Sequence, residues 1–190
     1  MDKRREATRT AIIEAAWEVV REQGLAALTL RAVAERVGMR APSLYSHFDS
    51  KNAIYDAMFG EAWSTYEALP DATDVPVQPR AALRARARRY VDFAVADLAR
   101  HQLMNLRLIH GFTPSAESYA PAVRVLDRLR EFCVSIGLDP GADVDLYTAL
   151  LAGLVDQQWA NDPGGDRWTR QVDRAVEMFA DAVGLPKESP

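Results

Sequence analysis

Cysteine is nearly missing from this 190-residue chain, since Cys133 is the only one. One thiol cannot form an internal disulfide or a cysteine-rich metal site, and Cys133 is expected to be a small buried helix residue rather than a redox group. The three histidines, His47, His101 and His110, follow no metal-ligand spacing. We therefore expect neither a metal nor another cofactor.

Long apolar runs and a signal sequence are also lacking. No stretch approaches the roughly 20 apolar residues that a membrane-spanning helix requires, and no basic segment followed by an apolar core opens the chain. These absences predict a protein that is neither secreted nor held in a membrane. The cytoplasm is the expected location.

The motifs of common enzyme classes are missing as well. The sequence has no nucleophile elbow, no phosphate-binding glycine loop and no close pair of carboxylates, and His101 and His110 have no recognisable catalytic partners. The composition, with 48% hydrophobic and 26% charged residues, is that of an ordinary globular protein. An enzyme is not expected.

What the chain does contain is a helix, a tight turn and a second helix between Thr29 and Lys51. Thr29 can cap a helix whose apolar positions have the spacing of one buried face, and Gly38 can end it in a left-handed turn. Pro42 suits the first turn of the next helix, because the N–H that it lacks would have no partner there. The apolar positions are Leu30, Val33, Ala34 and Val37.

The second helix, over residues 41–47, is predicted to turn Leu44 and Phe48 inward and to leave polar side chains outside. Such a helix suits the major groove of DNA, where hydroxyl and imidazole groups reach base edges and phosphates. The same geometry also occurs as a purely structural helical hairpin with a solvent-exposed face. The spacing alone does not decide between DNA binding and a structural hairpin.

Charge is distributed unevenly between the two parts of the chain. The net charge is −4, yet residues 1–51 hold nine Lys and Arg against seven Asp and Glu, a net +2, and the rest carries −6. A mildly basic N-terminal part, residues 1–51, on an acidic body, residues 52–190, fits a DNA-binding domain joined to a domain that does not bind DNA. The basic tail over residues 2–9 is read as a solvated terminus, with added phosphate contacts as the alternative.

A helix ending at Gly24, followed by LTLRAVAERVGMRAPSLYSHFDSKNAIYDAM, closely resembles the DNA-binding domain of the TetR family of bacterial transcription regulators. The resemblance covers roughly residues 8–60. Its most specific parts are Gly38, the run from Leu44 to Phe48, and the pair Ser50 and Lys51 that opens the next helix.

The resemblance implies an all-α fold of about nine helices, with an N-terminal three-helix helix-turn-helix domain and a larger C-terminal helical domain. It also implies which residues meet operator DNA. The implied phosphate contacts are Thr29, Arg31, Tyr45, His47 and Lys51. The implied base contacts are Arg40, Ala41, Pro42 and Ser43.

Three segments follow from the pattern: the DNA-binding domain over 1–51, a connecting helix over 52–69, and a C-terminal effector-binding and dimerisation domain over 70–190. Proline-rich residues 70–79 mark the boundary. In the body we predict helices over 80–99 and 102–110, a break over 111–121, and a helix from 123 to 137. The arginines of RARARR, residues 84–89, are predicted to form a solvated face rather than a second DNA site.

The last two helices of the body show the clearest apolar period. One carries Tyr147, Leu151 and Val155, and the other extends from Trp168 to Val183. Small residues on the first of them let another helix approach closely, so two copies can form a four-helix interface. The TetR resemblance also implies a homodimer through these helices.

A small-molecule effector is implied as the second partner, although each residue able to line its cavity is more readily explained as part of a filled core. Gln158 is the predicted polar anchor, whereas Asp156, Gln157 and Trp159 belong alternatively to the dimer seam. The candidate ligand residues are Trp63, Tyr66, Tyr90, Met104, Leu108, Tyr147 and Gln158. The predicted function is a ligand-responsive repressor that binds an inverted repeat, and the rival is a dimer that binds DNA without a ligand.

Overall fold

The computed structural model describes residues 3–70 and 78–187, and within these ranges it contains nine α-helices, two short 3-10 helices and no strand. The all-α prediction is confirmed. The chain forms two compact units, Met1–Glu67 with Asp97–Ala122, and Ala68–Ala96 with Val123–Pro190. This division differs from the predicted functional domains, because residues 97–122 pack with the N-terminal helices.

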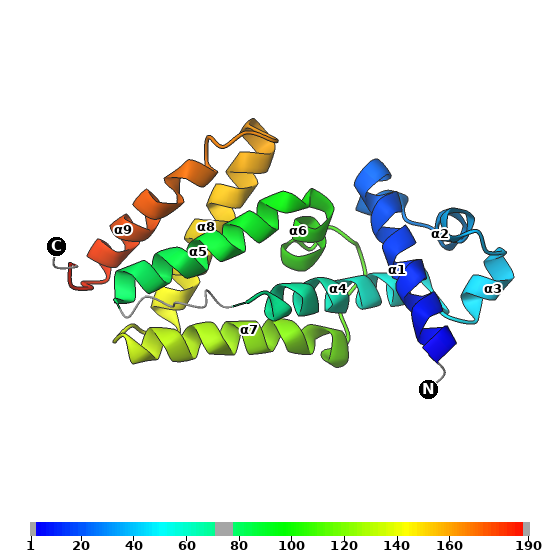
Figure 1. Cartoon of the computed structure of the whole chain (residues 1–190), viewed down its shortest axis with the longest axis horizontal. Coiled ribbons are helices and arrows are strands. Elements are labelled where there is room, and N and C mark those ends of the chain that lie inside the picture. The colour runs from blue at the N-terminus through cyan, green and yellow to red at the C-terminus, as the bar shows by residue number, and fades with distance from the viewer. Residues whose placement is uncertain (1–2, 71–77, 188–190) are drawn as a thin grey trace. The chain divides into compact units, whose positions relative to one another are not determined.

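The first unit is built around α1 (Lys3–Gln23), α2 (Leu30–Val37), α3 (Ala41–Tyr45) and α4 (Lys51–Ala68). Figure 1 shows α2 and α3 next to each other, with α2 packed on α1. The short helix α6 (Leu98–Asn105) and the first residues of α7 (Ala116–Ser135) complete the unit. Its fully buried core includes Ile12, Ala16, Leu28, Val33, Leu44, Ile54 and Met58.

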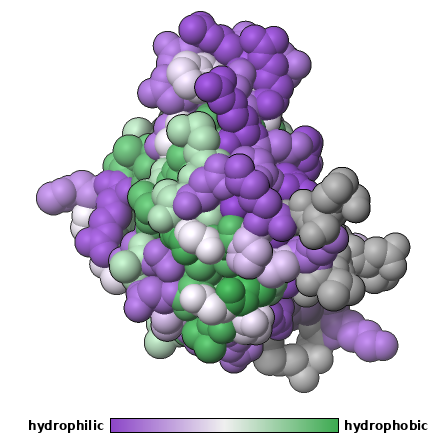
Figure 2. Space-filling view, turned by 90° about the vertical axis from the view of Figure 1, so that its left-hand side faces the viewer, coloured by the Kyte–Doolittle hydropathy of each residue, from purple (hydrophilic) through white to green (hydrophobic). Residues whose placement is uncertain are grey.

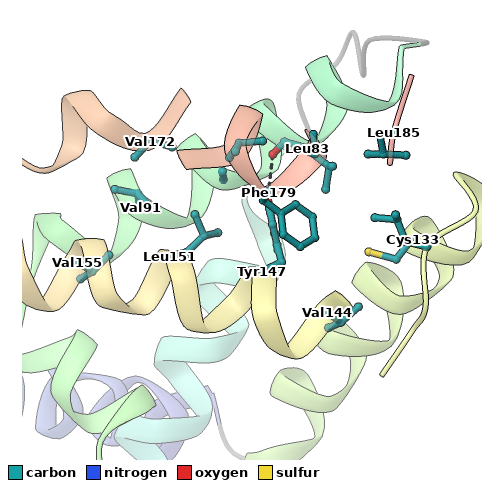
Figure 3. Close-up of a cluster of buried hydrophobic side chains, with 14 of the residues drawn as sticks. Leu83, Val91, Cys133, Val144, Tyr147, Leu151, Val155, Val172, Phe179 and Leu185 are labelled. Atoms are coloured by element: carbon teal, nitrogen blue, oxygen red, sulfur yellow. Dashed lines mark hydrogen bonds between the residues drawn. The ribbon is translucent and has the colours of Figure 1, made fainter. Parts of the chain in front are cut away.

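The second unit packs α5 (Pro79–Ala96) against α8 (Ala142–Asn161) and α9 (Val172–Ala182), together with the rest of α7. Figure 3 shows its apolar core, in which the Tyr147 hydroxyl donates a hydrogen bond of 2.7 Å to the Leu83 carbonyl. The ring of Phe179 lies 5.4 Å from the ring of Tyr147. Cys133 is buried on α7, as the sequence predicted.

Several predicted boundaries are wrong. The basic residues predicted as a tail are helical from Lys3 onward, so α1 is longer than expected. The helix predicted over 102–110 spans 98–105, because Asp97 caps it by accepting from the Arg100 N–H at 3.1 Å. The predicted break over 111–121 ends early, since α7 begins at Ala116 and includes Pro121. The predicted boundary loop over 70–79 lies mostly outside the described residues.

Candidate DNA-binding surface

The turn between α2 and α3 is fixed by two end caps on α2. The Thr29 hydroxyl accepts the Ala32 N–H at 3.0 Å, which satisfies a free amide of the first turn. At the other end Gly38 adopts φ 74°, a left-handed conformation that favours glycine, and the Met39 N–H donates to the Ala34 carbonyl at 2.8 Å. The predicted start and end of this helix are confirmed.

Helix α3 is held by its apolar side and displays its polar side. Leu44 and Phe48 are buried, with 0% and 2% of their surface exposed, as predicted. Pro42 and Ser43 lie on the exposed face. Tyr45 keeps 55% of its surface exposed, although a tyrosine ring carries enough apolar area to favour burial. The exposed side of α3 is therefore available to a partner.

The support for α2 comes from α1 through Arg36. Its guanidinium contacts Glu18 at 3.1 Å and Glu22 at 2.5 Å, both on α1. The hydrogen bond from Arg36 lowers the pKa of Glu22 below its ordinary value. Arg31 instead pairs with Glu35 on its own helix at 2.9 Å, and both side chains are well exposed. Such an exposed pair is weak enough to open for a phosphate.

His47 and Lys51 follow α3 and are both half-buried. The Nδ1 atom of His47 is shielded from solvent and bonds to no group in the part of the chain that the structure describes. The Lys51 ammonium lies 5.6 Å from the Tyr55 ring, and Ser50 caps α4 by accepting the Ala53 N–H at 3.1 Å. Lys51 thus stands at the positive end of α4, where its charge suits an anionic partner better than the helix itself.

The nine predicted DNA contacts come from three neighbouring elements: the start of α2, the turn with α3, and the start of α4. Six of them are exposed, namely Thr29, Arg31, Arg40, Pro42, Ser43 and Tyr45, and Ala41, His47 and Lys51 are half-buried. Their contact with DNA remains a prediction.

Two residues to which the sequence assigned no structural role hold this surface in place. Arg9 donates to the His47 carbonyl at 2.8 Å. Trp17 is buried and its indole N–H donates to the Glu61 carboxylate at 2.9 Å, which joins α1 to α4. Trp17 lies four residues after Ile13 and three before Val20, so the apolar period of α1 contained the signal for its burial.

The predicted ligand residues are divided between the two units. In the first unit Tyr66 and Met104 are buried, whereas Leu108 is 56% exposed. Trp63 packs edge-on to Tyr66, with ring centroids 6.1 Å apart. Its shielded indole N–H has no hydrogen-bond partner within residues 3–70 and 78–187.

In the second unit the polar atoms of the candidate ligand residues are already engaged. The Gln158 side chain is 3% exposed, donates to the Gly165 carbonyl at 3.1 Å and accepts from the Trp168 N–H at 2.9 Å. The Tyr147 hydroxyl is bonded to Leu83, and Tyr90 packs half-buried against the core. Gln158 therefore organises the loop after α8, and its role as an effector anchor remains a prediction.

The arginines of α5 pair or pack with other elements more than the predicted solvated face implied, although Arg88 is still 58% exposed. Arg84 pairs with Glu177, and Arg88 pairs with Asp173 at 2.5 Å, so both tie α5 to α9. Arg86 instead covers the Phe132 ring at 3.7 Å. Just before them Arg80 is buried at 4% exposure, where it contacts Glu177 at 2.8 Å, Asp181 at 2.7 Å and the carbonyls of Leu185 and Pro186. The sequence could not show these carboxylates, because they lie about 90 residues away.

Within residues 3–70 and 78–187, no group of three His, Cys, Asp or Glu side chains is arranged to hold a metal ion. The helices of these ranges also lack the combination of length and apolar character needed to cross a lipid bilayer.

The capped α2, the glycine turn and the exposed α3 on a helical core define a helix-turn-helix protein of the DNA-binding class. Residues 12–58 match the family described as bacterial regulatory proteins, tetR family. The tetracycline repressor protein class A from transposon 1721 of Escherichia coli is 29% identical over 164 residues, which cover 82% of this chain and 69% of that protein. Residues 12–58 of this chain therefore resemble the DNA-binding domain of the TetR family of transcriptional regulators, and the similarity to the class A repressor extends over most of the chain.

Other similarities are more limited in extent or in sequence. The class C tetracycline repressor protein of Escherichia coli is 44% identical over 50 residues, but the match covers only 26% of this chain and 23% of that protein. The crystal structure of AibR in complex with isovaleryl coenzyme A and operator DNA has a TM-score of 0.70 at 16% identity, covering 94% of this chain and 99% of AibR. At that identity the likeness concerns the fold.

Proposed function

We propose that this protein binds an inverted-repeat operator as a homodimer, represses transcription there, and is released by a small-molecule effector. The observation that carries the proposal is the exposed side of α3, with Tyr45 at 55% exposure, displayed by a capped helix-turn-helix that matches the family. Thr29, Arg31, Tyr45, His47 and Lys51 are assigned to phosphates, and Arg40, Ala41, Pro42 and Ser43 to bases. This function places the protein in the cytoplasm with the chromosome.

The functional division that we propose is residues 1–51 for DNA binding, 52–69 for connection, and 70–190 for effector binding and dimerisation. AibR, a protein of similar fold, forms a complex with isovaleryl coenzyme A and operator DNA, which supports this division. A coupling of about 1–3 kcal/mol between effector and DNA would change operator affinity roughly 5- to 150-fold.

The proposed dimer contact is the outer face of α8 and α9. Leu146 and Met178 are 54% and 64% exposed, so these two helices offer apolar side chains to a partner. A Cβ added to Gly153 would meet no atom within 4 Å, so this side of α8 is open. Figure 2 shows hydrophobic residues gathered in a band between hydrophilic ones on one side of the molecule.

The oligomeric state tests this contact directly. Light scattering after gel filtration is expected to give about twice the chain mass of 21.1 kDa, because two identical faces associate by a two-fold axis. Met178→Glu and Leu146→Glu are expected to give monomers, whereas Val134→Glu, also at an exposed apolar residue but on α7, is expected to remain dimeric. A monomeric parent protein would refute the proposed dimer.

DNA binding is tested by titrating a labelled duplex that the parent protein selects from a random-sequence library. Tyr45→Phe removes one hydroxyl and Lys51→Ala one cation, and each is expected to weaken binding about tenfold. Glu67→Gln, at the far end of α4, is the control and is expected to bind normally. Parent-like affinity of both variants would refute the assigned phosphate contacts, and failure to select any duplex would refute DNA binding itself.

The rival function, DNA binding without an effector, is separated by displacement. Candidate metabolites are added to the protein on its selected duplex, and a specific effector is expected to release the DNA in a saturable manner. If no substrate or product of the enzymes encoded near the bound chromosomal sites releases the DNA, the rival function is favoured.

A further inference from the structure

Arg9 reaches from α1 to the turn that follows α3. Its guanidinium donates a hydrogen bond of 2.8 Å to the backbone carbonyl of His47. The same guanidinium lies over the ring of Phe48, with 4.2 Å between its central carbon and the ring centroid. One side chain thus contacts two of the residues that connect α3 to α4.

Helix α3 has little stability of its own. It spans five residues and has no basic residue in its last turn, and so short a helix does not persist without tertiary support. The chain closes behind it through the N–H groups of His47 and Phe48, which donate to the Leu44 carbonyl at 2.9 and 3.0 Å. A cation that binds a carbonyl near the negative end of a helix stabilises that end.

Arg9 is held firmly enough to serve this purpose. It lies three residues before Ile12 and seven before Ala16, which are both completely buried, so it continues the buried stripe of α1. Phe48 beneath the guanidinium is 2% exposed. A cation–π contact over a buried ring adds to the hydrogen bond and restricts where the arginine can move.

We propose that Arg9 is a positioning residue for DNA recognition, which fixes the C-terminal end of α3 and does not itself bind phosphate. Capping the His47 carbonyl and covering Phe48 set the direction of α3, and with it the positions of Ser43 and Tyr45 on its exposed side. This inference rests on the proposed DNA-binding function. It assigns to α1 a part in operator selectivity.

Two measurements distinguish a positioning role of Arg9 from a phosphate contact: the salt dependence of DNA affinity, and the ratio of affinities for the selected and a scrambled duplex. Arg9→Gln, Arg9→Lys and Arg5→Gln are titrated with the duplex selected by the parent protein and with a scrambled duplex of equal length, at several salt concentrations. Arg5→Gln is the matched control, because it removes the same charge from an exposed position one turn earlier on α1.

If Arg9 positions α3, Arg9→Gln weakens binding to the selected duplex about tenfold, as expected for a lost charge-assisted hydrogen bond. The affinity of Arg9→Gln for the scrambled duplex then changes less than about threefold, and its salt dependence matches that of Arg5→Gln. Arg9→Lys recovers most of the preference for the selected duplex over the scrambled one. If Arg9 binds phosphate, both duplexes lose affinity equally and the slope of log K against log salt falls by about 0.9 relative to the control. That second pattern overturns the inference.

Hydrogen exchange of the backbone amides gives a readout that needs no DNA. Arg9→Gln is expected to speed exchange at His47 and Phe48, with exchange at Ile54 in the core unchanged. Unaltered exchange at His47 and Phe48 overturns the inference even if DNA binding is real. Faster exchange in a protein that selects no duplex supports the cap and refutes the proposed function instead.

Discussion

The carboxylate of Asp56 on α4 accepts both the backbone N–H of Ser115, at 2.6 Å, and the Ser115 hydroxyl, at 2.9 Å. It also accepts the Ser118 hydroxyl at 2.8 Å, and the Ser115 hydroxyl in turn caps α7 by accepting the Ser118 N–H at 3.2 Å. The approach is close, because a Cβ added to Gly60 would lie 3.2 Å from the Ser118 backbone. Asp56 therefore joins α4 to the beginning of α7.

Removing this carboxylate is expected to destabilise the first unit. Asp56→Ala loses three hydrogen bonds and should lower the free energy of unfolding in urea by about 2–3 kcal/mol. Ser118→Ala loses its hydroxyl contact and should cost about 1 kcal/mol. A loss below about 0.5 kcal/mol for Asp56→Ala, the range of a neutral surface change, would show that the junction is not stabilising.

Gln158 provides a test of structural against ligand-binding roles. Gln158→Ala leaves backbone groups of the loop after α8 without their side-chain partner and is expected to lower the free energy of unfolding by about 1–3 kcal/mol. Gln157→Ala, at the exposed neighbouring position, should change it by less than about 0.5 kcal/mol. Thermal unfolding of the unliganded protein measures both, and parent-like stability of Gln158→Ala would instead leave Gln158 free for an effector.

The Cys133 thiol is expected to be unreactive in the folded protein. Burial, with a further contribution from Asp143, raises its pKa to about 11. Only roughly a thousandth of the thiol is then ionised at pH 8, and the thiolate is the reactive form. A coloured disulfide reagent should therefore label Cys133 slowly in the native state and rapidly in guanidinium, and equal rates would contradict the burial.

The pair of Arg88 and Asp173 predicts an acid-dependent contribution to stability. The hydrogen bond from Arg88 lowers the pKa of Asp173 below its ordinary 3.8. A carboxyl whose pKa is lower in the folded state stabilises the protein above its unfolded pKa, and this contribution disappears as the pH falls through the folded value. The stability difference between the parent and Arg88→Gln should thus be constant from pH 7 to about 5 and shrink below about pH 4.

Urea unfolding across this pH range gives the comparison, and Arg174→Gln is the control because Arg174 is an exposed neighbour of Asp173 on α9. Both side chains of the Arg88 pair are about half exposed, at 58% and 44%, so the whole effect should be under about 1 kcal/mol. A difference that grows toward low pH would have the wrong sign and would contradict the assignment.

The helix-turn-helix was predictable because its determinants are close together in the chain. Thr29 caps α2 by accepting the N–H of Ala32, three residues later, and Gly38 ends the helix. Leu44 and Phe48 supply the buried side of α3. The start of α7 was not predictable in this way. Pro and Gly marked residues 111–121 as a break, whereas Asp56, some 60 residues earlier, holds Ser115 and Ser118 and so sets where the helix begins.

By itself the sequence determined the all-helical class, the capped turn and the period of the buried stripes, because caps, turns and amphipathic faces depend on residues within about one or two helical turns of each other. Only the tertiary structure decided what the charged side chains do. Arg9 binds a carbonyl 38 positions away and Arg80 a carboxylate 97 positions away. A cation's partner depends on which helices pack together, and the local period of the chain does not contain that information.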